Sequence, residues 1–86
     1  MANYRLVFRQ SVAKDLRVIP KAELRRILKR IETLTENPRP PGSEKLSGQE
    51  RYRVRQGVYR VVYEIKDKEL IVMIVTVAHR RKAYRG

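Results

Sequence analysis

The segment RYRVRQGVYRVVYEIKDKELIVMIVTVAH, from Arg51 to His79, decides the fold of this chain. Three runs in it are rich in β-branched and aromatic residues and predict strands over Arg51–Arg55, Val58–Ile65 and Leu70–Ala78. The connections between them, Gln56-Gly57 and Lys66–Glu69, have the length of hairpin turns, so the three strands should run antiparallel. The last run, LIVMIVTVA, is apolar on both faces, which favours a central strand or one covered by helices.

The residues that precede this segment predict one strand and two helices. Apolar and basic residues alternate around Leu6, which is typical of a short strand. Ser11 offers an N-cap for a short helix, and Pro20 ends that helix and suits the start of the next one. The second helix is predicted from an apolar stripe at three- and four-residue steps, formed by Leu24, Ile27, Leu28, Ile31 and Leu34.

The stretch NPRPPGS, from Asn37 to Ser43, predicts an ordered, turn-rich loop between the helices and the three strands. The expected fold is therefore α+β with the order β-α-α-β-β-β. It consists of a small, mainly antiparallel sheet with the two N-terminal helices packed on one face. Eighty-six residues are enough for one small core, so we expect a single domain over residues 1–86.

The net charge of +12 points to a polyanionic partner. There are 21 Lys and Arg residues against 9 Asp and Glu, and Arg outnumbers Lys by 14 to 7. Arginine is preferred where planar guanidinium groups hold phosphates, so the composition favours nucleic acid as the partner. The charge alone indicates this class of partner, but it does not indicate which activity the protein has.

Several kinds of site are missing from the sequence. The chain has no cysteine and one histidine, which excludes disulfides, thiolate metal sites and a cysteine nucleophile. No carboxylate spacing resembles a metal site, and the glycines form no phosphate-cradling loop. The longest apolar run is too short to span a bilayer, so we expect a cytoplasmic protein with no cofactor and no membrane association.

The positive charge is concentrated in two stretches without acidic residues, 51–60 and 79–86, which hold 8 of the 21 cations. Arg51, Arg53 and Arg55 occupy every second position of one predicted strand, so their side chains should project from one face. The hairpin turn then returns Arg60 beside them. Crowded guanidinium groups repel one another unless an anion shares the site, so this face is a candidate RNA-binding site or, alternatively, a solvated sheet face.

The second helix carries further cations: Arg25, Arg26, Lys29 and Arg30. They lie mostly off the apolar stripe. Two interpretations remain open for them, an ordinary solvated helix face and a surface that docks on structured RNA.

The segments YRVRQGVYRVVYEI and VAHRRKAYRG, with KLSG at residues 45–48 and the predicted element order, resemble the RelE branch of the RelE/ParE toxin superfamily. The resemblance covers nearly the whole chain and is most specific in the hairpin and the basic C-terminus. It implies the toxin of a type II toxin–antitoxin pair, held inactive by a cognate RelB-like antitoxin. Such a toxin cleaves mRNA in the ribosomal A site, and its antitoxin complex can also contact promoter DNA.

The resemblance also implies roles for individual residues. By position, the implied catalytic residues are Arg53, Arg55, Arg60, Arg80 and Tyr84. His79 and Arg81 are additional candidates, and Arg51, Lys82 and Arg85 are expected to bind RNA. In the implied chemistry the 2′-hydroxyl of the RNA attacks the adjacent phosphate without a metal ion, and Arg60 and Arg80 neutralise the growing charge.

The sequence departs from the family pattern where some relatives have lysine. Arg53 and Arg55 cannot lose a proton as a desolvated lysine can, so we expect both to bind and stabilise charge. The general base must then be Tyr84, His79, the ribosome or the substrate phosphate. Ala78 also replaces a glycine that is often found before the basic turn.

Two other classes of function remain on the same fold. One is a ParE-like inhibitor of DNA gyrase, against which the full arginine set of the hairpin argues. The other is a basic nucleic-acid-binding module without catalysis, which would bind in a salt-sensitive manner and cut nothing.

Overall fold

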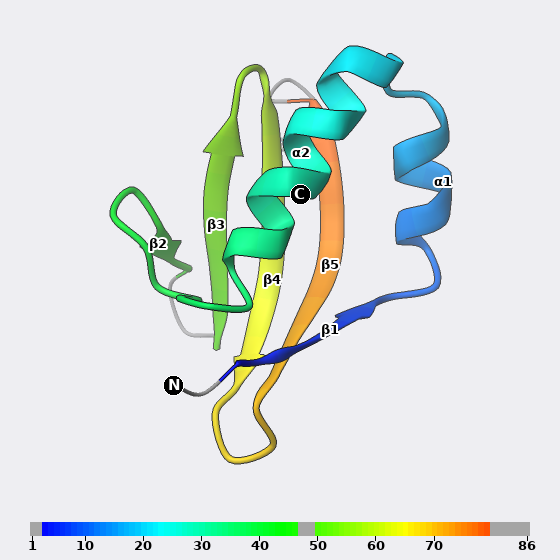
Figure 1. Ribbon diagram of the computed structural model, residues 1–86. Helices are drawn as coiled ribbons and strands as arrows, with labels where there is room; N and C mark the ends of the chain where they lie inside the picture. The colour runs from blue at the N-terminus through cyan, green and yellow to red at the C-terminus, as the bar shows by residue number, and fades with distance from the viewer. Residues whose placement is uncertain (1–2, 47–49, 80–86) are drawn as a thin grey trace.

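The structure, a computed structural model, describes residues 3–46 and 50–79. The elements follow one another along the chain as β1 (Arg5–Phe8), α1 (Val12–Arg17), α2 (Lys21–Thr33), β2 (Glu44–Lys45), β3 (Arg51–Gln56), β4 (Tyr59–Lys66) and β5 (Ile71–His79) (Figure 1). The predicted α+β class and the order of its main elements are thus confirmed. No helix in these two ranges is both long and apolar enough to cross a membrane.

The five strands form one mixed sheet with the order β1-β5-β4-β3-β2. β3, β4 and β5 are an antiparallel meander, and β1 pairs with β5 in parallel, with Arg5 opposite Ile71. β5 lies between β1 and β4, as its apolar sequence predicts for a central strand. This arrangement places the β3–β4 hairpin at one end of the sheet (Figure 1).

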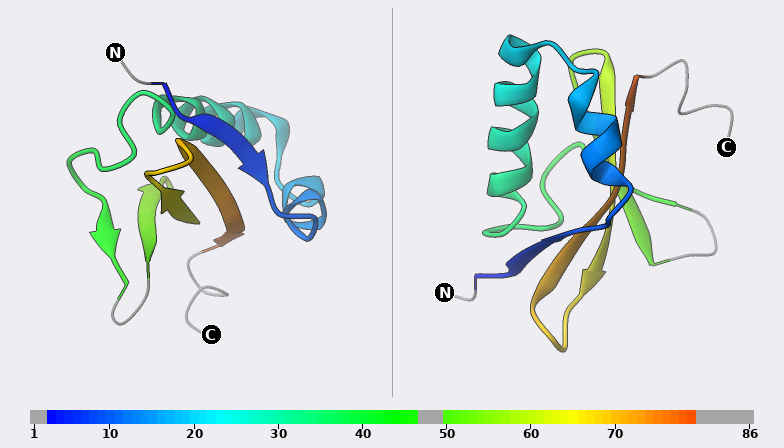
Figure 2. Two further views of the ribbon diagram at one scale, coloured as in Figure 1. Left: turned by 90° about the horizontal axis from the view of Figure 1, so that it is seen from below. Right: turned by 90° about the vertical axis from the view of Figure 1, so that its right-hand side faces the viewer.

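Both helices lie on the same face of the sheet, as expected (Figure 2). The core between the two layers consists of fully or nearly fully buried side chains from both: Val12, Ile19, Ile27, Ile31, Leu34, Val54, Val61, Tyr63, Ile65, Val72, Ile74 and Val77. Three residues of the predicted stripe of α2 belong to this core. Leu28 does not, because it is 38% exposed at the edge of the stripe.

The element boundaries differ from the sequence prediction: one short strand was not predicted, β3 is one residue longer, and β4 and β5 are each displaced by one residue. β2 was not predicted, since two residues give no periodic signal; it pairs antiparallel with β3, with Glu44 opposite Arg53. The hairpin turn is Gly57-Val58 rather than Gln56-Gly57, because Gln56 pairs with Tyr59 as the last rung of the ladder. Gly57 has φ of +61°, which the first position of a two-residue type II′ turn requires.

The loop after α2 is held against the sheet by hydrogen bonds. The hydroxyl of Tyr63 is buried and donates to the Pro38 carbonyl oxygen at 2.6 Å. Arg39 donates to both oxygens of Asp67, at 3.2 and 2.9 Å, and its Nε donates to the Tyr52 hydroxyl at 3.1 Å. The predicted ordered loop is therefore tied to β3, to β4 and to the turn that follows β4.

These contacts shift the acidities of the groups involved. The hydrogen bonds from Arg39 and Tyr4 hold the pKa of Asp67 below its ordinary value of 3.8. Burial raises the pKa of Tyr63 to about 12. The first shift means that the ionised carboxylate of Asp67 stabilises the folded chain at neutral pH. The second means that burial disfavours the phenolate of Tyr63, which weakens the fold only at alkaline pH.

Candidate functional site

The β3–β4 hairpin brings the predicted arginines together on the sheet face opposite the helices. Val54 points into the helix-side core, so Arg53 and Arg55, its neighbours in β3, point away from it. The pairing places Arg60 of β4 directly opposite Arg55. Arg51, Arg53, Arg55 and Arg60 thus share one face, as the alternation in the sequence predicted.

Two of the four arginines are neutralised, which corrects the expectation of a face without acids. Arg51 Nε donates to Glu64 Oε2 at 2.8 Å, and Arg53 donates to Glu44 Oε2 at 3.3 Å. Both carboxylates come from neighbouring strands, so residues 51–60 lack acids along the chain but not in space. The two carboxylates lie beside Arg51 and Arg53, away from the end of the hairpin where Arg55 pairs with Arg60.

Arg55 and Arg60 occupy that end. Arg55 is exposed to solvent, whereas Arg60 is only 4% exposed. Both line a hollow of about 60 Å³, together with residues 57–59 of the turn. This volume is that of roughly two water molecules at about 30 Å³ each, so the hollow is of a size for a small anionic group.

The Arg55–Arg60 pair has a clear chemical capacity. Two guanidinium groups in neighbouring strands can direct several N–H donors at one anion, and Arg60 does so from a site largely withdrawn from water. Donors in such a site are fixed before the reaction and are weakly screened by solvent. The geometry suits a phosphate group that gains charge during a reaction.

His79 lies on the other face of the sheet. Val75 is the extra residue of a bulge: Val62 pairs with Thr76 and Tyr63 with Ile74, so Val75 has no partner in β4. The bulge reverses the alternation of β5, because Ile74 and Val77 both contribute to the helix-side core. Ala78 is therefore the residue opposite Arg60.

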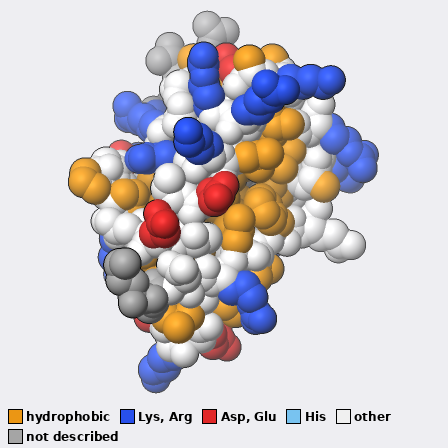
Figure 3. All heavy atoms as spheres, viewed as in Figure 1, with side chains coloured by type: hydrophobic (Ala, Val, Ile, Leu, Met, Phe, Trp, Pro, Cys, Tyr) orange, Lys and Arg blue, Asp and Glu red, His pale blue; other side chains and the backbone are white. Residues whose placement is uncertain are grey.

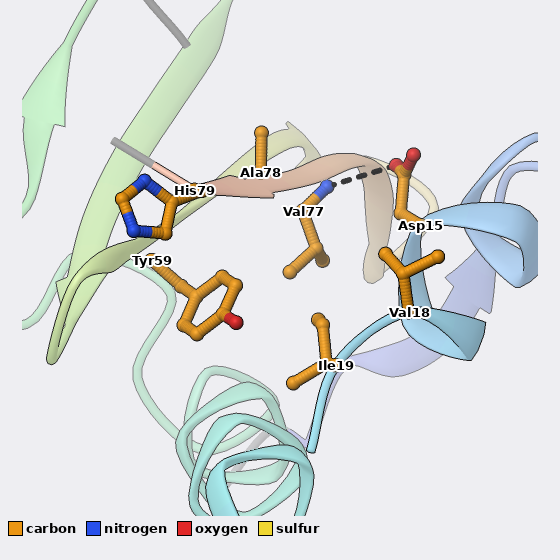
Figure 4. Close-up of a pocket in the computed structure, with 7 residues that line it drawn as sticks. All are labelled: Asp15, Val18, Ile19, Tyr59, Val77, Ala78 and His79. Atoms are coloured by element: carbon orange, nitrogen blue, oxygen red, sulfur yellow. Dashed lines mark hydrogen bonds between the residues drawn. The ribbon is translucent and has the colours of Figure 1, made fainter. Parts of the chain in front are cut away.

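The aromatic contact of His79 agrees with this assignment. Its ring meets that of Tyr59 edge-on, with 5.6 Å between the centroids (Figure 4). The two rings line a cavity of about 340 Å³ between α1 with the residues that follow it, the start of β4 and the end of β5. The other lining residues are Asp15, Val18, Ile19, Val77 and Ala78. Desolvation, followed by the charge of Glu23, raises the pKa of Tyr59 in this cavity. The structure therefore does not bring His79 together with Arg55 and Arg60.

The other predicted site residues lie outside the described residues: Arg80, Arg81, Lys82, Tyr84 and Arg85. They follow directly on β5, whose last residues flank the hairpin that carries Arg60.

Three acidic residues near this site were missed by sequence reasoning. Glu64 was missed because the observed turn Gly57-Val58 sets it opposite Arg51, whereas the predicted turn Gln56-Gly57 would have set Val62 there. Glu44 lies in the unpredicted strand β2. Asp15 of α1 accepts a hydrogen bond from the Val77 backbone N–H at 3.1 Å, a contact over 62 positions for which the sequence gives no signal (Figure 4).

Comparisons with known proteins agree with this fold. The family model for the ParE toxin of the type II toxin–antitoxin system parDE matches residues 3–84. A protein of Methanocaldococcus jannaschii that is assigned as toxin RelE1 is 35% identical over 79 residues, which cover 87% of this chain and 88% of that protein.

Solved structures of toxin–antitoxin complexes show the same fold. The archaeal RelE–RelB complex of Pyrococcus horikoshii contains a chain that is 34% identical, with a TM-score of 0.81 and coverage of 93% of this chain and 97% of that one. The RelBE2 complex of Mycobacterium tuberculosis contains a chain that is 26% identical, with a TM-score of 0.83 and coverage of 93% and 94%.

Proposed function

Since the chain belongs to the RelE/ParE superfamily as a RelE-type toxin of a type II toxin–antitoxin system, we propose that it is a ribosome-dependent endoribonuclease that cuts mRNA in the A site. The 2′-oxygen of a nucleotide attacks the adjacent phosphorus, and the bond from phosphorus to the 5′-oxygen breaks. The products are a 2′,3′-cyclic phosphate and a 5′-hydroxyl. The proton leaves the 2′-oxygen and an equivalent proton reaches the departing 5′-oxygen.

The observation that carries this proposal is the hollow shared by Arg55 and Arg60. The non-bridging oxygens of the phosphate gain charge as the 2′-oxygen adds, and a guanidinium group beside them stabilises that charge more than it stabilises the starting phosphate. Arg60 supplies this stabilisation from its enclosed position, and the exposed Arg55 binds the incoming phosphate. The ribosome would align the three reacting atoms, which explains why so few residues of the toxin are needed.

The ion-paired arginines have a supporting role in this mechanism. Arg51 and Arg53 are each held by one carboxylate, so they contact the RNA backbone as binding residues rather than at the reacting phosphate. We assign the same binding role to Lys82 and Arg85. We assign to Arg80 and Arg81 the neutralisation of charge on the phosphate, the role that the family resemblance implies for Arg80.

The proton transfer is assigned to Tyr84 or to groups of the ribosome and substrate. Arginine does not lose its proton at physiological pH, which excludes Arg53 and Arg55 as bases. His79 faces the cavity with Tyr59, on the sheet face away from Arg60, so it takes no part in this step. A single-turnover pH–rate profile tests the assignment: Tyr84→Phe should remove an ionisation from the profile, and His79→Gln should leave the profile unchanged.

A cognate RelB-like antitoxin would hold the toxin inactive. The solved relatives from P. horikoshii and M. tuberculosis are toxin–antitoxin complexes. A chain with a net charge of +12 suits an acidic segment that covers the arginine face, and the complex could also contact promoter DNA. The ribosome as target places the activity in the cytoplasm.

The experiment is 5′-end mapping of an mRNA in a purified translation system, with and without ribosomes. The proposal predicts cuts within the A-site codon that need both ribosome and toxin. Absence of cuts by folded, antitoxin-free protein would contradict it.

A second candidate follows from the matching family model, which is that of the ParE toxin. A ParE-like function predicts inhibition of DNA gyrase supercoiling at the concentrations that arrest growth. Supercoiling inhibition that survives Arg60→Met, in a protein that cuts no mRNA, would favour this candidate.

A further inference from the structure

We propose that α2 carries a second RNA contact, a phosphate-binding hollow that docks on the folded RNA of the ribosome; this inference rests on the proposed function. The hollow has a volume of about 260 Å³ and is lined by Arg26, Lys29, Arg30 and Thr33 of α2 and by Gln56 of β3. Among the described residues, three cations and no carboxylate line it. Roughly eight water molecules of about 30 Å³ each would fill it, which is room for a backbone phosphate with its sugar.

The cations that line this hollow form no ion pair in the part of the chain that the structure describes. Among residues 3–46 and 50–79, no ion pair involves Arg26, Lys29 or Arg30. The spacing i, i+3, i+4 places their like charges side by side on the helix, which is unfavourable until an anion joins them. The acids of α2 lie to either side: Glu23 lines a smaller hollow with Arg26, and Glu32 lines another with Lys29.

One nitrogen atom of Arg30 also has no hydrogen-bond partner among the described residues. Its Nε is buried and finds no hydrogen-bond acceptor among the residues that the structure describes. Buried donors in folded proteins are normally paired, and leaving one unpaired costs stability. The unpaired Nε shows that the contacts of the folded chain leave this guanidinium group incompletely satisfied beside Arg26 and Lys29 in the hollow.

The position of the hollow identifies the kind of RNA. Arg55 and Gln56 are consecutive in β3, so one projects toward the Arg60 hollow and the other toward α2. Figure 3 shows Lys and Arg side chains around the end of the molecule where α2 begins and the hairpin turns. The two phosphate sites therefore lie on opposite faces of one hairpin. A single extended strand at Arg60 cannot also occupy the α2 hollow, whereas a folded RNA that surrounds the hairpin contacts both.

The test compares two double variants with the same net charge. Arg26→Ala/Lys29→Ala removes two cations that line the hollow. Lys21→Ala/Arg25→Ala removes two exposed cations of the same helix that line none of these three hollows. Binding is measured by sedimentation with purified ribosomes over a series of salt concentrations. Three other probes are measured alongside: a 20-nucleotide single-stranded RNA, a 20-base-pair DNA duplex and a polyglutamate peptide.

We expect the hollow variant to bind ribosomes about tenfold more weakly, with the salt slope reduced by about 0.7 for each lost phosphate contact. The control should stay within about threefold of the wild type, since it loses no phosphate contact. Equal loss in both variants, or a loss seen only with the single strand, the duplex or polyglutamate, would overturn the proposal. Because binding is measured without cleavage, a toxin that docks but cuts nothing would contradict the nuclease assignment alone.

Discussion

Arg55 and Arg60 face each other across the β3–β4 hairpin, and Arg55 is exposed whereas Arg60 is almost completely enclosed. The two guanidinium groups carry the same charge, but their different exposure to solvent gives them different roles. The exposed guanidinium meets the RNA first and is screened by water and salt, whereas the enclosed one acts in a less polar environment. We therefore expect Arg55 to contribute mainly to binding and Arg60 mainly to the chemical step.

Replacing Arg55 should weaken binding more than chemistry. Arg55→Ala removes one phosphate contact, so the salt slope of RNA binding should fall by about 0.7–0.9. The single-turnover rate at saturating ribosome concentration should fall by less than about tenfold, since Arg60 remains in place. A saturating rate that falls as far as that of an Arg60 variant would contradict this division of roles.

Removing the carboxylate that holds Arg53 should strengthen RNA binding. Glu44 competes with phosphate for this guanidinium, and exposed ion pairs are worth about 0.2–1 kcal/mol. Glu44→Gln should therefore raise the affinity for single-stranded RNA about two- to fivefold. Glu36→Gln makes the same change of charge on a residue outside the arginine face and serves as the control. An equal gain in both variants would show that only net charge matters.

The ionised carboxylate of Asp67 should make the free energy of unfolding decrease at acidic pH. Its pKa is held below 3.8 by Arg39 and Tyr4, so the stabilisation is complete well above pH 3.8 and is lost as the pH falls through the lowered value. Asp67→Asn should destabilise the protein at pH 7, and its difference from the wild type should shrink toward pH 3. Urea unfolding at pH 7, 5 and 3 measures this. A difference that stays constant with pH would contradict the assignment.

The hydroxyl of Tyr63 should contribute more to stability than that of Tyr52. Tyr63→Phe leaves the Pro38 carbonyl oxygen without its buried donor, which should cost about 1–3 kcal/mol. Tyr52→Phe removes an exposed acceptor of Arg39 and should cost less than about 1 kcal/mol. Because the pKa of Tyr63 is about 12 in the folded chain, its contribution at alkaline pH is lost between about pH 10 and 12. Equal losses in the two variants would argue against the buried bond.

The sequence predicts much of this fold, because period-two and helical patterns follow directly from which side chains are buried. The strands from Arg51 onward and the apolar stripe of α2 are examples. The short strand β2 escaped prediction since its two residues are exposed and their pairing depends on tertiary structure.

The sequence predicts the candidate site less completely, because it does not show how the residues of neighbouring strands are paired. Extending the alternation of Val72 and Ile74 would place His79 on the arginine face, and the bulge at Val75 reverses this. No residue type in that run signals a bulge. In the same way, the ion pair between Arg53 and Glu44 requires a strand pairing that only the folded chain shows.

The central claim is that Arg60 stabilises charge at the phosphate during attack by the 2′-oxygen. The most direct test is the single-turnover rate of cleavage on ribosomes with a defined A-site codon, for the wild type, Arg60→Lys and Arg60→Met. Thermal unfolding confirms that each variant is folded. A substrate with a 2′-deoxy nucleotide at the cleaved position checks the nucleophile.

Arg60→Met should lower the rate by about 10³-fold or more at unchanged ribosome affinity, because an arginine that stabilises phosphoryl transfer contributes about 10³–10⁵. Arg60→Lys should recover part of the rate, since it restores the charge without the planar fork. The 2′-deoxy substrate should not be cut by any of the three proteins. A folded Arg60→Met variant that cleaves at the wild-type rate, or cleavage of the 2′-deoxy substrate, would contradict the account.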